Sequence, residues 1–229
     1  MSSQPASWSW TGSALLTDLD GVLVDSRSVV ETAWRWWAER VGVDPAALLP
    51  VSHGVRAVDT IVRFAPHLDV DVEEAALVAV ELELAEQLGP VPGTDALIAA
   101  VPRERWAVVT SGSRRLATAR LEQVGLPRPE VLVAAEDVAA GKPDPEGYLA
   151  AAAALGVAAG DCLVVEDAPA GVAAAGAAGC TVVALTTTHA PGQLQAADLI
   201  VADPRAILLQ VGDGKLLATH EPALTVTVD

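Results

Sequence analysis

Short apolar segments alternate with segments of helical periodicity along most of the chain. The apolar segments are candidate strands at residues 14–17, 106–110, 131–134, 162–165, 181–185 and 199–201, with an added edge strand at 224–228. One helical pattern between them follows Ser113 and stops at Gly125, with helical spacing of Leu116, Arg120, Leu121 and Val124. Another has Asp144 as its expected N-cap and Pro145 as its first residue. This alternation predicts βαβ units and therefore an α/β fold with a Rossmann-like parallel sheet.

One long segment, residues 28–88, breaks the alternation because it carries helical patterns and no convincing strand. Ser28 and Glu31 have the spacing of a capping box, which predicts a helix start there. The tryptophans that follow have helical spacing, which favours packing in a core over a sugar-stacking platform. They are Trp34, Trp36 and Trp37, and a later apolar stripe contains Leu77, Val80, Leu84 and Leu88.

A helical insert directly after the first strand predicts that the chain folds into two domains. We expect an α/β core formed by residues 1–26 and 90–229, and an α-helical cap formed by residues 27–89. The cap is expected to lie over the strand ends, joined to the core by hinges at 26–27 and 89–93.

Composition narrows the possible partners. The 229 residues include 14 Lys and Arg against 30 Asp and Glu, for a net charge of −16. Such an acidic chain repels nucleic acids and anionic lipids, so neither is an expected partner. A small phosphorylated ligand remains compatible, because a local pocket can be positive within an acidic protein. The N-terminus lacks the pattern of a signal peptide, and no apolar run reaches bilayer-spanning length, so a cytoplasmic location is expected.

The cysteines and histidines offer no metal-binding pattern. Cys162 and Cys180 are too few for a disulfide framework and lie in apolar segments, which favours buried packing thiols. The four histidines are scattered, which argues against a zinc site built from them.

Polar residues suited to catalysis cluster in four loops of the predicted core. In open α/β sheets, ligands bind outside the carboxyl ends of the strands. Each loop taken alone would be an ordinary solvated loop, but four at this edge indicate one site. The candidate residues are Asp18, Asp20, Ser111, Gly112, Lys142, Glu166 and Asp167.

This set suits phosphoryl transfer. A carboxylate such as Asp18 can attack phosphorus and form an acyl phosphate, which hydrolyses readily. The nucleophile and the phosphate are both anions, so a divalent cation is needed, and oxygen-only ligands such as Asp18 and Asp167 suit Mg²⁺. Lys142 adds a fixed positive charge, and Ser111 with nearby amides can hold phosphate oxygens.

The four loops resemble the four motifs of the haloacid-dehalogenase superfamily. These motifs are Asp18-Leu19-Asp20-Gly21, Thr110-Ser111-Gly112, Gly141-Lys142-Pro143-Asp144-Pro145 and Glu166-Asp167. The similarity covers about residues 14–205, and the insert resembles the α-helical cap of that superfamily. A closer resemblance, to phosphatases acting on sugar and polyol phosphates such as 2-deoxyglucose 6-phosphate and glycerol phosphate, rests on residues 53–56, 141–148 and 164–171.

The resemblance implies a Mg²⁺-dependent phosphatase that releases phosphate through an aspartyl phosphate. Asp18 would be the nucleophile and a metal ligand. Asp20 would protonate the leaving alkoxide and then take a proton from water, with its backbone carbonyl on the metal. Lys142 would offset the charge of Asp18 and the phosphoryl group.

The remaining matched residues would bind rather than react. Ser111 and Gly112 would bind phosphate, and Asp167 would complete the Mg²⁺ site with Glu166 beside it. In the cap, His53 and Arg56 fall where the resemblance places substrate-facing groups, with Arg56 gripping a sugar hydroxyl or a second phosphate. The alternative is that Arg56 is a surface charge and His53 caps a turn.

Two other activities and one non-catalytic role share the fold. Dehalogenases need neither the metal nor the second aspartate, so Asp20 argues against them. A phosphomutase of the β-phosphoglucomutase type keeps every core motif and remains the main alternative. A non-catalytic regulatory or sugar-binding module would not need the intact acidic set. The favoured function is therefore a phosphatase, working as a monomer on a small phosphorylated metabolite, with polyol, hexose and nucleotide leaving groups all open.

Overall fold

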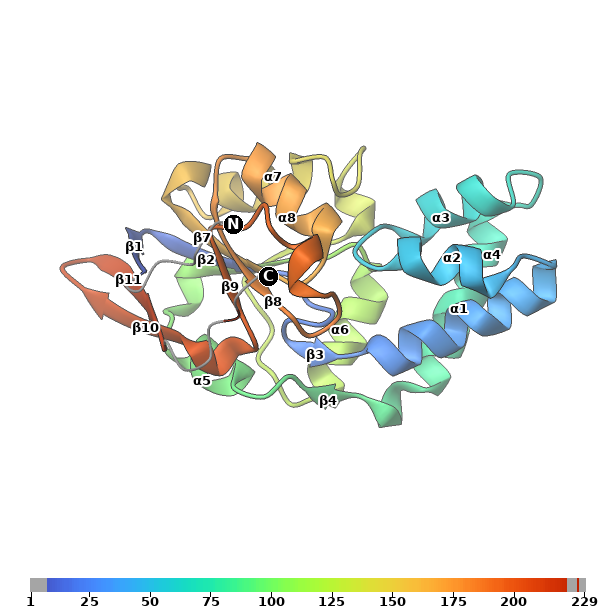
Figure 1. Ribbon diagram of the computed structural model, residues 1–229, viewed down its shortest axis with the longest axis horizontal. Helices are drawn as coiled ribbons and strands as arrows, with labels where there is room; N and C mark the ends of the chain where they lie inside the picture. The colour runs from blue at the N-terminus through green and yellow to red at the C-terminus, as the bar shows by residue number, and fades with distance from the viewer. Residues whose placement is uncertain (1–7, 222–225, 227–229) are drawn as a thin grey trace.

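A six-stranded parallel sheet forms the centre of the computed structural model, which describes residues 8–221 and residue 226 (Figure 1). In spatial order its strands are β6 (Val131–Val133), β5 (Trp106–Val109), β2 (Ala14–Thr17), β7 (Cys162–Glu166), β8 (Thr181–Leu185) and β9 (Leu199–Val201). Every neighbouring pair is parallel. The central strands are buried on both faces, which explains why they read as continuous apolar runs. The predicted α/β parallel sheet is confirmed.

Helices cover both faces of this sheet. They are α5 (Thr94–Ala99), α6 (Arg114–Gln123), α7 (Glu146–Ala154) and α8 (Pro169–Ala177). Leu15 and Val165 point to the face packed against α5 and α6. Leu16 and Val164 point to the opposite face, against α7 and α8. Alternate residues of one strand therefore enter two separate hydrophobic cores.

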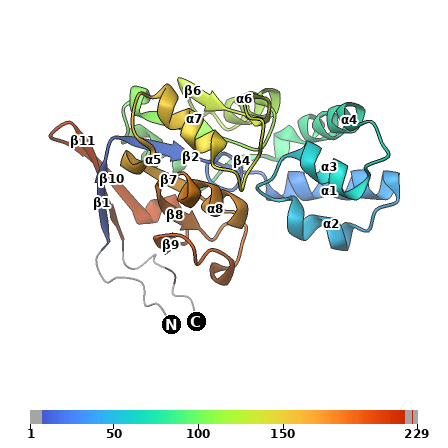
Figure 2. The same ribbon diagram turned by 90° about the horizontal axis from the view of Figure 1, so that it is seen from above.

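The segment after β2 forms the predicted helical insert, which extends beyond one end of the sheet (Figures 1 and 2). Its helices are α1 (Arg27–Val41), α2 (Pro45–Ser52), α3 (Ala57–Phe64) and α4 (Val70–Glu83). Trp37, Leu48, Ile61 and Leu77 belong to a third hydrophobic cluster that is confined to this insert. The insert thus has a core of its own, and we keep the name cap for residues 27–89.

The three tryptophans of α1 do not share one environment. Trp34 and Trp37 are buried and meet edge to face, with their ring centroids 5.5 Å apart. The Trp37 indole N–H donates to the buried carboxylate of Glu73. Trp36 is 38% exposed and lies beneath the guanidinium of Arg40. Core packing therefore describes Trp34 and Trp37 but not Trp36.

The chain leaves and re-enters the core through two segments that lie side by side. They are β3 (Val24–Asp25) and β4 (Gly89–Pro90), which pair antiparallel. The expected hinge at 26–27 directly follows β3, and the expected hinge at 89–93 begins with β4.

Two helix starts differ from those expected. Helix α1 begins at Arg27 after Ser26, and Glu31 pairs with Arg27 and Arg35 on the helix surface. The predicted capping box of Ser28 and Glu31 is therefore wrong. Helix α7 begins at Glu146, one residue later than expected, although the Asp144 carboxylate accepts the Glu146 N–H as an N-cap would. Helix α6 begins as predicted, with the Ser113 hydroxyl accepting the Leu116 N–H.

A second, antiparallel sheet was not predicted. Its strands are β1 (Ser9–Gly12), β11 (Lys215–His220) and β10 (Ile207–Gly212). Asp213 and Gly214, both with positive φ, form the two-residue turn between β10 and β11. Asp-Gly between apolar segments is a hairpin signal that could have identified this pair. The strand expected at 224–228 lies outside the described residues except for Val226, whose N–H donates to the Ile200 carbonyl.

Other features of the described residues are minor. Short 3₁₀ helices occupy Ala85–Gln87, Arg103–Arg105, Ala135–Asp137, Ala159–Asp161, Pro191–Gln193 and Pro204–Ala206. Cys162 and Cys180 are buried free thiols, as predicted. Among residues 8–221, no helix has the length and apolar character that crossing a bilayer requires.

Candidate active site

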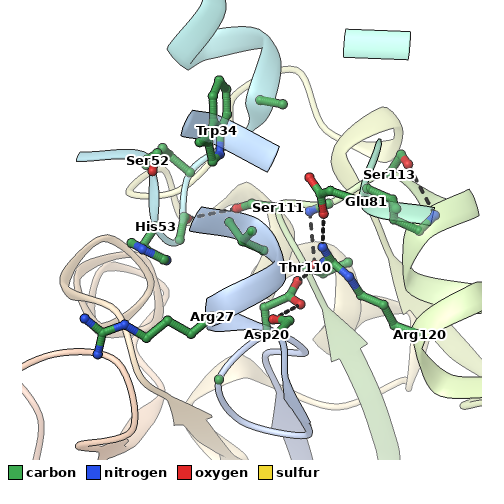
Figure 3. A pocket seen from close by; sticks show the side chains of 18 of the residues that line it. Asp20, Arg27, Trp34, Ser52, His53, Glu81, Thr110, Ser111, Ser113 and Arg120 are labelled. Carbon is green, nitrogen blue, oxygen red and sulfur yellow. Dashed lines mark hydrogen bonds and ion pairs between the residues drawn. The ribbon is translucent and has the colours of Figure 1, made fainter. Parts of the chain in front are cut away.

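A cavity of about 80 Å³ lies between the carboxyl ends of the central strands and the cap (Figure 3). The core contributes Asp18, Asp20 and Asp167 to its wall, and the cap contributes Trp34 and His53. Because the strands are parallel, their carboxyl ends place loops that are distant in sequence around one space. Three of the four predicted loops therefore converge on a cavity that both parts of the chain enclose. The fourth loop does not line the cavity, but its Lys142 contacts Asp18 from behind.

Lys142 connects the first and last acidic loops. Its Nζ donates to Asp18 Oδ1 at 2.6 Å, to Glu166 Oε1 at 2.6 Å and to the Val109 carbonyl at 3.1 Å. The three N–H bonds of the ammonium are thus all used, which fixes its position. Burial opposes the charged amine, but the carboxylates of Asp18 and Glu166 outweigh it and raise the pKa of Lys142.

The carboxylates of the site carry more negative charge than Lys142 balances. Burial raises the pKa of Asp18 to about 7, although Lys142 opposes this shift. Burial, together with the charges of Glu166 and Asp18, also raises the pKa of Asp167 well above its usual value. Ligand oxygens of Asp18, Glu166 and Asp167 lie within 4.8 Å of one another. This buried, oxygen-only triad could bind a hard divalent cation such as Mg²⁺.

The Glu166 carboxylate accepts more hydrogen bonds from the protein than the carboxylates of Asp18 and Asp167 do. Its Oε1 accepts from Lys142 and from the Tyr148 hydroxyl, at 2.9 Å for Tyr148. Its Oε2 accepts the N–H groups of Asp167 and Ala168. These bonds suit Glu166 to orienting Lys142 and the Asp167 loop, and they leave Asp18 and Asp167 with more oxygen capacity for a cation.

The Glu166 carboxylate fits against a helix that has no side chain at the point of contact. A Cβ added to Gly171 of α8 would lie 1.6 Å from Glu166 Oε1. We expect Gly171→Ala to displace Glu166 or α8, destabilise the fold by ~1–3 kcal/mol and reduce activity. Denaturant unfolding and steady-state kinetics would measure both effects.

Gly176 is the matched control in the same helix, because no atom lies within 4 Å of a Cβ added there. Gly176→Ala should stabilise the protein by ~0.5–1 kcal/mol through helix propensity. Equal responses of the two variants would contradict the contact assigned to Gly171.

Asp20 faces the same cavity and is held at both oxygens. The Ser26 hydroxyl donates to Oδ1 at 2.6 Å, and Arg120 Nη1 donates to Oδ2 at 2.5 Å. Arg120 also contacts Glu81 of α4 (Figure 3). The side chain of Asp20 is 28% exposed, against 7% for Asp18. Asp20 is thus the more accessible of the two aspartates to a ligand in the cavity.

The candidate phosphate-binding residues line the cavity beside these aspartates. The Ser111 hydroxyl donates to the Gly54 carbonyl of the cap at 2.9 Å. The Gly112 N–H donates to the Thr110 hydroxyl at 3.0 Å. The predicted role of Ser111 and Gly112 stays a prediction.

The two cap residues singled out from the sequence lie in different surroundings. His53 lines the cavity, with its ring centroid 6.0 Å from that of His189 in the core. Arg56 makes a two-pronged ion pair with Asp59 and also donates to the Val138 carbonyl at 3.1 Å. The guanidinium of Arg56 therefore fastens the cap to the 138–139 segment of the core in this structure.

Sequence reasoning missed several residues that support the site. Tyr148 holds Glu166, Thr188 donates its hydroxyl to the Asp167 carboxylate, and Arg120 holds Asp20. One signal was available: Arg120 occupies a position in the apolar face of its helical pattern, where a charged residue requires a buried partner. Glu81, four residues after Leu77 in α4, carries the complementary signal.

Comparisons with known proteins place the chain in a family. Residues 13–179 match the haloacid dehalogenase-like hydrolases. Hexitol phosphatase A of Escherichia coli is 43% identical over 81% of this chain and 88% of that protein. Glycerol-1-phosphate phosphohydrolase 2 of Saccharomyces cerevisiae is 36% identical over 76% of this chain and 75% of that protein. A hydrolase from Pseudomonas syringae superposes with a TM-score of 0.75 at 26% identity, covering 84% and 94% of the two chains.

Proposed function

The chain belongs to the haloacid dehalogenase-like hydrolases, and from that premise we propose that it is a Mg²⁺-dependent phosphatase of small sugar or polyol phosphates. The observation that carries the proposal is the buried Asp18 carboxylate, fixed 2.6 Å from Lys142 beside the cavity that Asp20 also lines. The relatives that act on hexitol and glycerol phosphates support the polyol class.

The first step transfers the phosphoryl group to the enzyme. A carboxylate oxygen of Asp18 attacks phosphorus, the bond from phosphorus to the ester oxygen breaks, and an aspartyl phosphate forms. Asp20 gives its proton to the departing alkoxide, which leaves as an alcohol. Lys142 keeps Asp18 oriented and offsets negative charge as the phosphoryl group arrives.

The second step restores the enzyme. Asp20, now a carboxylate, takes a proton from a water molecule as that water attacks phosphorus. The bond from phosphorus to Asp18 then breaks, which releases inorganic phosphate and leaves Asp20 protonated for the next cycle. One residue thus serves as acid and then as base.

The acidic residues also suit a magnesium ion. Asp18 and Asp167, with the backbone carbonyl of Asp20, would hold Mg²⁺ when it is bound. The ion would neutralise part of the charge of the phosphate and of the buried carboxylates. Burial is the main cause of the raised pKa values of Asp18 and Asp167, and the neighbouring carboxylates add to it. A bound cation would favour the charged forms of both side chains.

The position of Arg56 favours hydrolysis over the phosphomutase alternative. A phosphomutase must hold a second phosphate while the sugar turns over in the site. Arg56 is the cap residue expected to bind a sugar hydroxyl or a second phosphate, and its guanidinium is paired with Asp59 and with core carbonyls. This arrangement supports a phosphatase.

Product analysis tests the proposal. We expect phosphate release with Mg²⁺ in a screen of phosphorylated metabolites, fastest with hexitol or glycerol phosphates. Followed by ³¹P NMR with β-glucose 1-phosphate and a bisphosphate primer, the enzyme should release phosphate without forming the 6-phosphate. Isomerisation faster than phosphate release would show a mutase instead.

The paired strands β3 and β4 carry a prediction about cap movement. Cap closure over bound substrate would exclude bulk water from the site. With Mg²⁺ and a metal-fluoride mimic of phosphate, amide hydrogen exchange should slow at residues 26–27 and 89–93. Unchanged exchange at both segments would count against a moving cap. The amides of β11, which lies in the separate antiparallel sheet, provide the internal reference.

A further inference from the structure

One buried arginine lies between two carboxylates that come from different parts of the molecule. Arg120 of α6 is 4% exposed, and its Nη1 donates to Oδ2 of Asp20 at 2.5 Å. Its Nη2 donates to Oε2 of Glu81, a buried residue of cap helix α4. Figure 3 shows the three side chains in a row along the wall of the cavity.

Because a guanidinium is rigid, Arg120 couples the position of Glu81 to that of Asp20. Its nitrogens lie in one rigid plane, so the two carboxylates it binds are held at a fixed separation. The ion pair of Arg120 with Glu81 is buried, and the pair with Asp20 is buried on the arginine side while Asp20 reaches the cavity. Both are charge-assisted hydrogen bonds, which are stronger than neutral ones. A change in the position of Glu81 must therefore move Arg120 or break one of the two contacts.

The other carboxylate oxygen of Asp20, Oδ1, is also held, by a residue directly before the cap. Ser26, which donates to it, is the N-cap of α1 and directly follows strand β3. One Asp20 oxygen is thus held from the start of α1 and the other, through Arg120, from α4. Both anchors belong to the boundary between the cap and the core.

We propose that Glu81 and Arg120 are positioning residues that orient the Asp20 carboxylate according to the position of helix α4. The inference rests on the proposed function only in giving Asp20 the acid and base role. It goes beyond that function by making a cap residue, Glu81, part of the acid–base machinery without touching substrate.

Leaving-group dependence provides the test. The kcat/KM value reports the first phosphoryl transfer, in which an alkyl phosphate needs the proton from Asp20 and p-nitrophenyl phosphate needs little protonation. We expect Arg120→Met to lower kcat/KM for the fastest alkyl phosphate ~10–100-fold more than for p-nitrophenyl phosphate. Arg120→Lys should recover part of this selective loss, and Glu81→Gln should show a smaller selective loss in the same direction.

Two matched controls lie on the same helices. Arg115 of α6 and Glu83 of α4 are exposed, so Arg115→Met and Glu83→Gln should leave the ratio of the two kcat/KM values unchanged. If Arg120→Met and Glu81→Gln lowered both kcat/KM values equally, in step with their melting temperatures, the two residues would be merely structural. A Glu81→Gln ratio equal to that of Glu83→Gln would also overturn the proposal.

A second readout does not depend on turnover. Crystal structures of Arg120→Lys and Glu81→Gln should show the Asp20 carboxylate turned from its position in the unchanged protein. An unmoved Asp20 in both variants would overturn the positioning role, whatever the kinetics. A moved Asp20 in an enzyme that releases no phosphate from any ester would instead reject the proposed function alone.

Discussion

Replacing Asp18 with asparagine should abolish phosphate release, with a loss of more than ~10⁴-fold in kcat. The substitution keeps the shape of the side chain and one carbonyl oxygen, but it removes the anion that attacks phosphorus. The loss should be nearly complete, because Asp18 forms the covalent bond in the first step and no neighbouring group has the same position. Phosphate release from the best ester of the metabolite screen, with Mg²⁺ present, would measure it.

The matched control for this change is Asp95→Asn, at an exposed position of α5 far from the site in sequence. Its activity should equal that of the unchanged enzyme. Chelation by EDTA should remove activity as completely as Asp18→Asn does, and added Mg²⁺ should restore it. Substantial turnover by Asp18→Asn, or an EDTA-insensitive rate, would rule out the proposed mechanism.

Replacing Lys142 with methionine should damage both activity and stability. The change keeps most of the apolar stem and removes the charge that Asp18 and Glu166 share. Breaking a buried ion pair by removing one partner costs about 3–5 kcal/mol, because the remaining charge is left uncompensated. We expect kcat/KM to fall ~10²–10³-fold through the loss of electrostatic stabilisation of the transferred group.

The stability loss should depend on pH in a defined direction. Without Lys142, burial raises the folded-state pKa of the two carboxylates above their unfolded values. Their protonated forms are then favoured by the fold, and stability falls as pH rises through the raised pKa values. Denaturant unfolding without metal should therefore show a larger loss for Lys142→Met at pH 8 than at pH 5.

The chain contains one other lysine, Lys215, which is exposed and donates to Ser13. Lys215→Met should leave both activity and the pH dependence of unfolding unchanged. A pH-independent loss in Lys142→Met would show that the lysine acts by packing and not by charge.

The sequence was sufficient to predict the sheet and its acidic edge for a physical reason. Strands buried on both faces are continuous apolar runs, and parallel strands place their carboxyl ends together. Asp18 and Asp167 could therefore be assigned to one place although they lie in distant loops. The helical insert was equally readable, because its periodicity differs from that of the segments on either side.

The side chains that hold the site residues in place could not be predicted from the sequence in the same way. The partners of Arg120 come from the first loop and from a cap helix, so they follow from how the cap sits on the core and not from local pattern. Arg56 shows the reverse case, since its place in a motif did not reveal that Asp59 and the 138–139 carbonyls hold it. Side-chain partners across the boundary depend on tertiary packing.

Local signals also competed at one helix start. Ser26 and Ser28 both precede the same apolar stripe, and capping-box spacing favoured the second of them. The structure starts α1 after Ser26, whose hydroxyl binds Asp20 instead of capping the helix. The Ser26 hydroxyl is thus used to hold Asp20 and not to cap the N-terminus of α1.

The ribbon of β3 and β4 has a consequence for the order of folding. Strands β2 and β5 are neighbours, with Leu15 opposite Trp106, so their pairing closes a loop of about ninety residues. A cap that folds first on its own core brings Asp25 and Gly89 together and shortens that loop to about thirty residues. The entropy of loop closure grows with the logarithm of length, so this shortening lowers the cost of pairing β2 with β5 by ~1 kcal/mol. A cap that forms early would thus speed the assembly of the central sheet.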